Sequence, residues 1–280
     1  MSLNLKLLTR FIRTLVPLAG GLALAGCATS PTGENTLLLN SPTQMNALGQ
    51  KSFEQVKANT AIETNPGINR YVRCVSEALL DRLPARYGIQ PQQWEILVFR
   101  NEAVNAFAVP GGKIGVYTGM LDMVENQDQL ASVIGHEISH VLAQHSNARL
   151  SQQQLTSAGL SAANLLLTNR VEAGTQQALM SAMGLGAQYG VILPYSRAHE
   201  READVLGQEL MADAGFDPRE AASLWRKMAS EGGSTPPEFL STHPAPTNRV
   251  TLLNERVQKL LPIYLEARDA GRAPRCEAQR

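Results

Sequence analysis

The 280-residue sequence predicts an α+β, mainly helical fold with a small β-sheet beside one central helix. Long stretches carry apolar residues at spacings of three, four and seven, which is typical of helices that pack on a core. Residues rich in β-formers and turn signals gather between positions 94 and 118. Hydrophobic residues make up 44% of the chain, which is enough for a sizeable core. The formal net charge of +0 argues against an electrostatic nucleic-acid binder.

The first 26 residues have the pattern of a bacterial secretory signal peptide. A basic start is followed by an apolar stretch over residues 15–25. The sequence Leu24-Ala25-Gly26-Cys27 then resembles a lipobox, which implies cleavage before Cys27 and lipidation of its thiol. Several acyl chains on one residue suffice for stable anchoring. Ala28 in place of Asp favours the outer membrane; an uncleaved membrane anchor is the alternative.

Residues 27–42 are polar after the cysteine and suit a tether between the lipid and a folded domain. We expect a helix over about residues 43–60 and a second amphipathic helix that begins at Pro66. Residues 94–100, 104–109 and 113–118 predict three strands, the last two joined by the turn Pro110-Gly111-Gly112. A short helix over residues 119–125 leads into the central helix.

The central helix is predicted over residues 129–150, which contain no proline. Asn126 and Asp128 are suitable N-caps. Gly135 in its interior lowers helix propensity. Either a side chain there would crowd a neighbouring backbone or a substrate, or the helix packs closely against another.

This helix contains His136-Glu137-Ile138-Ser139-His140, which reads H-E-x-x-H. Residues four apart lie about 40° apart around a helix, so His136 and His140 share a face and can bind one metal ion. Glu137 can take a proton from a metal-activated water. The motif predicts a metal site, although such pentapeptides also occur by chance.

A catalytic zinc usually has a third protein ligand. Ala143 and Ser146 exclude the longer motif with a third histidine on the same stretch. His145 lies nine residues after His136, about 180° around a continuous helix, and is expected to face away from the metal.

The better candidate lies in a second polar helix over residues 195–204. Glu200 could complete a His-His-Glu set, and Asp204, four residues later, could orient a ligating imidazole; Glu202 points elsewhere. The alternative is a solvated helix whose acids pair with Arg197 and Arg201.

Residues 157–193 are rich in Ala, Gly, Leu and Met. We interpret them as helical segments beside or over the site, with glycines that would permit a moving lid. A re-entrant membrane hairpin is the alternative.

Two further residues are candidates for catalysis. We expect a helix over residues 217–229, a loop over 231–237 and a helix opened by Pro246. His243, in the loop between them, could stabilise an oxyanion, occupy the open metal position, or simply bond to backbone. Arg249 could anchor that loop or polarise a carbonyl.

Four blocks of the sequence together match one protein family: Asn105-Ala106-Phe107-Ala108-Val109-Pro110-Gly111-Gly112; His136 to His140 with Val141 and His145; Ser196-Arg197 with Glu200-x-x-Ala203-Asp204; and Ser241-Thr242-His243-Pro244 with Arg249. In this order they resemble the HtpX-like and CAAX-prenyl-protease-like zinc metallopeptidases, and within them the bacterial lipoprotein proteases of the LoiP and BepA type. The resemblance implies a zincin-like endopeptidase of the gluzincin type with one zinc per chain, His136, His140 and Glu200 as ligands and Glu137 as the base. Neither the membrane-spanning helices of HtpX nor the tetratricopeptide array of BepA is expected.

The resemblance also implies a division of the chain and a substrate class. It places the peptidase domain at residues 43–262, before a tail of residues 263–280. The strand at Asn105, Ala106, Phe107 and Ala108 would bind an extended substrate at its edge, whereas the sequence alone fits an ordinary hairpin equally well. Unfolded or misassembled envelope proteins would be cleaved at the periplasmic face of the outer membrane. The alternative function is a non-proteolytic lipoprotein chaperone of such proteins; a third possibility, a structural zinc lipoprotein, would need His243 as a permanent fourth ligand.

The cysteine content fits an exported protein. After Cys27, only Cys74 and Cys276 remain. In an oxidising periplasm, two otherwise unpaired thiols are expected to form a disulfide bond.

Overall fold

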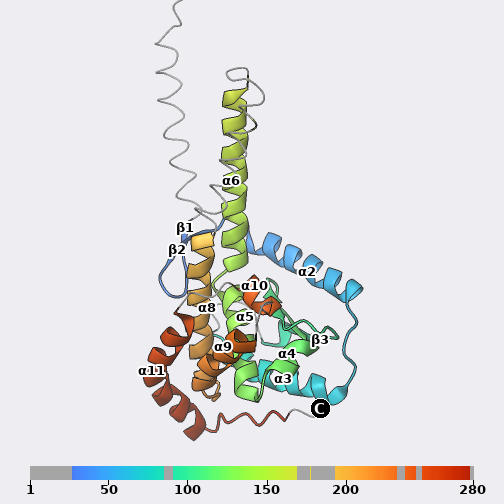
Figure 1. The fold of residues 1–280 in the computed structure, drawn as a ribbon, viewed down its shortest axis with the longest axis vertical. Coiled ribbons are helices and arrows are strands. Elements are labelled where there is room, and N and C mark those ends of the chain that lie inside the picture. Colours follow the sequence, from blue (N-terminus) through green and yellow to red (C-terminus); the bar gives the residue numbers. More distant parts are fainter. Residues whose placement is uncertain are drawn as a thin grey trace, which may run out of the picture.

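The computed structural model describes residues 27–84, 91–168, 177, 193–231, 237–243 and 248–277. A three-stranded sheet lies beside a group of packed helices, and helix α6 extends away from this body (Figure 1). The predicted α+β, mainly helical fold with a small sheet beside the H-E-x-x-H helix is confirmed. Among the described residues, no helix is long and apolar enough to cross a membrane.

The sheet consists of β3 (Glu95–Phe99), β4 (Ala106–Val109) and β5 (Lys113–Tyr117) in the order β3-β5-β4. A 3-10 turn (Pro91–Gln93) precedes β3. β5 pairs in parallel with β3 and antiparallel with β4. The turn between β4 and β5 requires glycine, because Gly111 and Gly112 have φ angles of 89° and 72°. Because β5 is the central strand, β4 forms one edge of this sheet.

Two helices from the first third of the chain cover the sheet. Helix α2 (Pro42–Asn59) begins with a capping box formed by Ser41 and Gln44, and α3 (Pro66–Leu80) is capped by Asn65. Phe53 of α2 is fully buried and meets Phe99 of β3 edge to face, at a centroid distance of 6.0 Å. The apolar face of α3 joins the main core against the sheet and the central helix.

The predicted central helix is in fact two helices. After the short α4 (Thr118–Met123), α5 (Gln127–Leu142) ends at Ala143, and α6 (His145–Leu167) starts in a new direction. Gln144 separates them in the left-handed conformation, with φ 55°. The expectation of one helix over residues 129–150 is wrong because no Gly or Pro marks this break.

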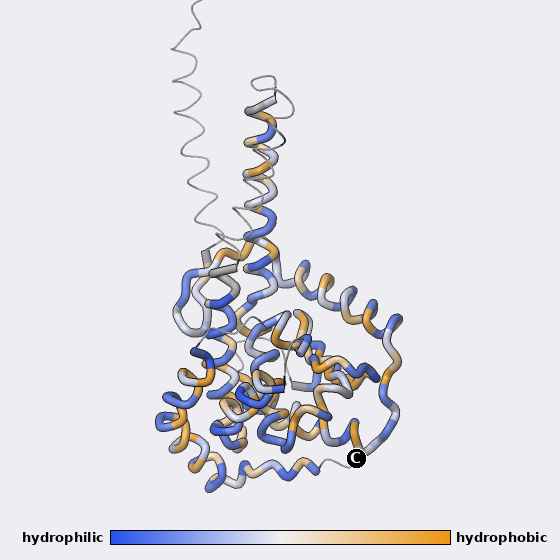
Figure 2. The backbone as a smooth tube through the Cα atoms, in the orientation of Figure 1, coloured by the Kyte–Doolittle hydropathy of each residue, from blue (hydrophilic) through white to orange (hydrophobic). Residues whose placement is uncertain are grey.

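Helix α6 projects from the body and alternates hydrophilic with hydrophobic segments along its length (Figure 2). Leu155 and Leu165 are 48% and 76% exposed on it. It includes the first part of the segment 157–193; most of that segment, with the predicted lid, lies outside the described residues.

The helices of the second half are α8 (Leu193–Asp213), α9 (Arg219–Glu231), the short α10 (Glu238–Thr242) and α11 (Arg249–Asp269). Of these, α8 and α9 pack against α5, and α11 packs against α8 and α9. α8 makes the most extensive contact with α5. Helices were expected at each of these places except the short α10, where the sequence indicated a loop around His243.

Helices α5 and α8 cross where two glycines meet. A Cβ atom on Gly207 would lie 2.8 Å from the backbone nitrogen of His136, and one on Gly135 would lie 3.1 Å from the carbonyl oxygen of Gly207. The structure therefore supports close helix packing at Gly135, and the backbone that a side chain there would crowd belongs to α8. The contact lies directly beside the first histidine of the motif.

The polar segment after Cys27 is folded onto the domain. Strands β1 (Cys27–Thr29) and β2 (Asn35–Leu37) pair antiparallel. The backbone N–H of Leu39 donates to the Ser151 hydroxyl at 2.8 Å, which fixes the segment to α6. It is thus more than the loop-like tether that its composition indicates.

The tail of the chain returns to α3. A disulfide bond joins Cys74 of α3 to Cys276, across 202 positions of sequence. The Gln127 side chain at the start of α5 also accepts the backbone N–H of Cys276 at 2.7 Å. The tail is therefore fixed to both α3 and the start of α5.

The glycine crossing gives a prediction about stability. Gly207→Ala should lower the free energy of unfolding by about 1–3 kcal/mol, because the added methyl group collides with the backbone of α5. Gly159→Ala is the matched control, since nothing lies within 4 Å of a Cβ atom there. Chemical denaturation should show the control unchanged or slightly more stable. Equal stability of the two variants would contradict the tight crossing.

The disulfide gives a second prediction. Replacing both Cys74 and Cys276 with Ser should lower the free energy of unfolding by about 2–5 kcal/mol, because the closed loop is long. Reductant should destabilise the exported wild-type protein and leave the double variant unaffected. Mass analysis without reductant should find the bridge, and two free thiols in the exported protein would refute it.

Candidate metal centre

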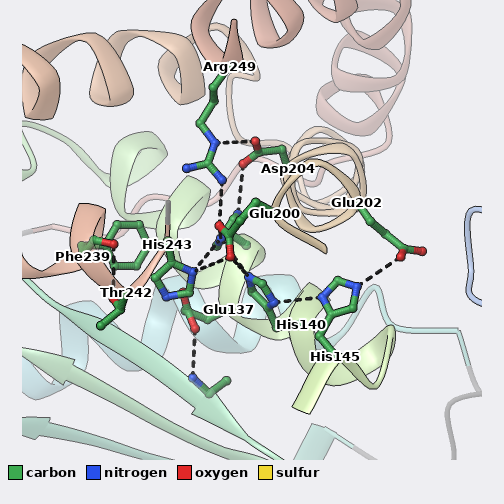
Figure 3. A network of polar contacts seen from close by, with 12 residues as sticks. Glu137, His140, His145, Glu200, Glu202, Asp204, Phe239, Thr242, His243 and Arg249 are labelled. Carbon is green, nitrogen blue, oxygen red and sulfur yellow. Dashed lines mark hydrogen bonds and ion pairs between the residues drawn. The ribbon is translucent and has the colours of Figure 1, made fainter. Parts of the chain in front are cut away.

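Four side chains from three parts of the chain converge beside the glycine crossing. Helix α5 supplies His136 and His140, α8 supplies Glu200, and His243 follows directly after α10 (Figure 3). Their candidate ligand atoms all lie within 4.8 Å of one another. The structure thus brings together the three residues predicted as ligands and adds His243 to them.

The distances fit donors around a common centre. Nε2 of His136 lies 3.0 Å from Nε2 of His140 and 3.3 Å from Oε2 of Glu200. Nδ1 of His243 lies 3.2 Å from Oε1 of Glu200 and 3.3 Å from Nε2 of His136. Three imidazole nitrogens and one carboxylate form the donor set that zinc accepts in tetrahedral sites.

The electrostatics of the cluster favour a positive charge at its centre. Burial would raise the pKa of Glu200, but hydrogen bonds with His136 and His243 hold it well below its usual range. Burial would lower the pKa of His136, but its bonds to Asp204 and Glu200 raise it to about 9. Burial and the neighbouring His136 lower the pKa of His140 well below its usual value. A divalent metal ion would supply the favoured charge and displace the proton from His136.

Asp204 and Arg249 hold two members of the cluster in place. Asp204 Oδ1 lies 3.1 Å from Nδ1 of His136, which leaves Nε2 directed at the centre. Nη2 of Arg249 donates to Glu200 Oε2 at 2.8 Å, and its Nε donates to Asp204 Oδ2. The guanidinium also stacks on Trp225, at 3.8 Å from the ring centroid. Arg249 is 3% exposed, so its contacts favour an orienting role over contact with a substrate carbonyl.

Glu137 lies between the cluster and the sheet. Its Oε2 accepts the backbone N–H of Ala108 at 3.2 Å, whereas Oε1 lies 3.3 Å from Nε2 of His243 without a well-aligned hydrogen bond. Burial raises the pKa of this carboxyl. The side chain is therefore placed to accept a proton beside the metal donors.

The predicted substrate strand is β4; among the described residues no strand pairs with its outer edge, and the strand packs against α5. Side chains in this stretch have structural partners: Asn105 donates to Glu238 at 2.9 Å, and Ala106 is 1% exposed. Phe107 packs over Gly115 of the neighbouring strand and meets Phe53 at 6.2 Å. The backbone of Ala108, rather than these side chains, is the part of the strand nearest the site.

His145 is the residue that the sequence misplaced. It was expected to face away, yet its Nδ1 lies 2.9 Å from Nδ1 of His140, because the break at Gln144 places the first residue of α6 beside this ligand. Its Nε2 bonds to Glu202 at 3.1 Å, and Glu202 does point away from the cluster, as predicted. In the sequence, the only indication of this arrangement was the position of His145 five residues after His140 and of Glu202 two residues after Glu200.

Comparison with known proteins agrees with this geometry. The model of peptidase family M48 matches residues 68–257. The chain is 32% identical over 212 residues to a protein named mitochondrial metalloendopeptidase OMA1 of Schizosaccharomyces pombe, covering 74% of this chain and 59% of that protein. It is 30% identical over 222 residues to one named beta-barrel assembly-enhancing protease of Yersinia pestis, covering 77% and 44%. The protein of the same name from Escherichia coli K12 is 28% identical over 238 residues, covering 83% and 47%. The chain thus spans about half the length of the relatives it matches.

Proposed function

Because the chain belongs to peptidase family M48, we propose that it is a zinc-dependent endopeptidase of the bacterial cell envelope. The observation that carries the proposal is the convergence of His136, His140 and Glu200 beside Glu137 and the edge of a strand. Two imidazoles and a carboxylate leave a fourth position for chemistry, as catalytic zinc sites do.

We assign the steps of peptide hydrolysis to groups of this chain. Zinc bound there would polarise the scissile carbonyl and lower the pKa of a water molecule toward neutrality. Glu137 takes the proton from the attacking water and passes it to the leaving amine. Oε1 of Glu137 suits this task because it accepts no aligned hydrogen bond among the described residues. Its raised pKa makes the Glu137 carboxylate a stronger base toward the proton of the attacking water.

The substrate is proposed to bind as an extended strand along β4. An edge strand offers backbone N–H and C=O groups to an added chain. Ala108 is the point of closest approach, since its N–H already reaches Glu137 at 3.2 Å. A peptide paired with β4 would therefore present its backbone to the base and the metal donors. Recognition of backbone rather than side chains fits substrates that are unfolded.

His243 is proposed to occupy the fourth position in the resting state. Its Nδ1 lies within 3.3 Å of both His136 and Glu200, among the other donors. Phe239 holds the ring, stacked at a centroid distance of 4.5 Å. For water and substrate to enter, the His243 ring has to leave.

The proposed substrates are unfolded or misassembled envelope proteins. Support comes from the name of two relatives, beta-barrel assembly-enhancing protease, and from the lipobox-like sequence that ends at Cys27. The lipid on Cys27 would place the domain at the periplasmic face of the outer membrane. The division into a signal peptide of residues 1–26, a lipidated segment of residues 27–42, a peptidase domain of 43–262 and a tail of 263–280 belongs to this proposal, although residues 27–40 are folded onto the domain.

Glu137→Gln tests the mechanism. The variant should retain about one zinc per chain, as catalytic sites do, because the ligands are unchanged, and it should lose casein cleavage, because an amide cannot take the proton. Metal analysis and a casein assay on the mature chain measure both. Chelation should abolish wild-type cleavage, and added zinc should restore it.

Glu77→Gln is the matched control, because the exposed Glu77 side chain pairs with Arg73 on the outer face of α3. It should cleave like the wild type. Cleavage that survives in Glu137→Gln would disprove the assigned base. Zinc without cleavage in every form, together with suppressed aggregation of unfolded outer-membrane proteins, would favour the chaperone alternative.

His243→Ala tests the fourth position. Zinc content should stay near that of the wild type because three ligands remain, whereas turnover should rise because the position is free. A loss of about 10²–10³-fold would instead assign His243 to oxyanion stabilisation. Loss of the zinc itself would favour an enclosed structural site. Unchanged turnover and zinc would remove His243 from the mechanism.

A further inference from the structure

We propose that His145 and Glu202 position the ligand His140, and that the hairpin after Cys27 supports this pair through Thr32. The inference rests on the proposed zinc site and extends it to residues beyond the ligands. In this proposal, the segment that contains Thr32 helps to hold a ligand of the metal centre in place.

The contacts form one continuous line away from the cluster. Nδ1 of His140 lies 2.9 Å from Nδ1 of His145, and Nε2 of His145 lies 3.1 Å from Oε2 of Glu202 (Figure 3). His145 and Glu202 are only 3% and 6% exposed. Water therefore has little access to these bonds.

Metal binding fixes the direction of every hydrogen bond in this line. If Nε2 of His140 binds the metal, Nδ1 carries its proton and must donate to His145. Nδ1 of His145 is then the acceptor, and its Nε2 carries a proton that it donates to Glu202. A single arrangement of protons satisfies both rings, and it ends on a carboxylate.

The other histidine ligand is supported in a parallel way. His136 bonds directly to Asp204 at 3.1 Å, whereas His140 reaches its acid through one intervening imidazole. Both acids belong to α8, which also carries Glu200. Glu202 projects from a different side of α8 than Glu200, so an intermediate ring is needed to bridge the gap.

The break between α5 and α6 lies directly before His145, the ring that joins His140 to Glu202. In a continuous helix His145 would lie about 180° from His136. Gln144 instead adopts φ 55°, a conformation that is uncommon for residues other than glycine. The turn brings His145 beside His140, so the uncommon conformation of Gln144 is what allows the two rings to form a hydrogen bond.

Thr32 completes the line at its outer end. Its backbone N–H and its hydroxyl donate to Oε1 of Glu202 at 3.3 and 2.7 Å. The segment that carries Thr32 is fixed to α6 by the bond from Leu39 to Ser151 and by the pairing of Asn40 with Asn147. Both oxygens of Glu202 are thereby used, one for the ring and one for the hairpin.

The alternative role for His145 is packing alone, since it also stacks on His199 at a centroid distance of 4.1 Å. Variants that keep shape but change hydrogen bonding separate the two roles. Glu202→Gln and Thr32→Val are nearly isosteric, and His145→Phe keeps a ring without its nitrogens. Packing alone would be insensitive to the first two.

The experiment measures zinc affinity of the full mature chain by competition with a chelator. Glu202→Gln and His145→Phe should weaken zinc binding by about 10–100-fold. Thr32→Val should weaken it less, since one of two donors remains. With cobalt in place of zinc, the visible spectrum of Glu202→Gln should shift because the His140 ring is no longer fixed. The thermal midpoint of the metal-free protein shows that each variant is folded.

Two controls match these changes. Glu209→Gln removes a carboxylate from the same helix, where it pairs with Arg256 at the surface. Thr43→Val changes an exposed threonine on α2. Both should bind zinc like the wild type.

Wild-type affinity in both Glu202→Gln and Thr32→Val would overturn the inference, even if His145→Phe proves unfolded. A wild-type chain that binds no zinc would overturn the proposed function and this inference with it. A wild-type chain that binds zinc and cleaves casein, beside a Glu202→Gln variant of equal affinity and spectrum, would overturn only the positioning role.

Discussion

The backbone contact between Gly135 and Gly207 is the constraint on which the metal centre depends. It lets α5 and α8 approach so closely that a methyl group at Gly207 would lie 2.8 Å from the nitrogen of His136. His136 follows the contact immediately, and Glu200 lies two helical turns before Gly207 on α8. Close packing of the two helices therefore allows the side chains of His136 and Glu200 to meet at 3.3 Å.

Close packing of these helices concentrates charge, and the surrounding residues balance it. Helix α8 directs Glu200, Glu202 and Asp204 into buried positions. Uncompensated, such burial would be strongly destabilising. Arg249 bonds to Glu200 and Asp204, whereas Glu202 is shared by His145 and Thr32. Each acid thus has at least one hydrogen-bond partner that holds its side chain in place.

The sequence predicted features that depend on neighbouring residues, but it did not predict contacts between residues far apart in the chain. The strands, the caps and the i, i+4 pair of His136 and His140 follow from short-range patterns, so they could be predicted. The break at Gln144 could not, because it is favoured by contacts of His145 with His140 and Glu202 rather than by a local breaker. The parallel pairing of β3 with β5 and the docking of Thr32 on Glu202 join residues that no periodicity relates. For the site, the family resemblance supplied part of this missing information, because it grouped Glu200 and His243 with the H-E-x-x-H motif.

The edge of β4, the base and the fourth ligand position form one linked arrangement. The N–H of Ala108, which an added strand would need, is bonded to Glu137, and the other oxygen of Glu137 faces His243 at 3.3 Å. In the proposed mechanism, a substrate strand that pairs with Ala108 competes with Glu137 for this N–H. Glu137 then turns toward the attacking water, into the space that His243 occupies. Binding at the edge, release of the base and displacement of His243 are therefore expected to occur together, so that hydrolysis begins only when an extended chain is in place.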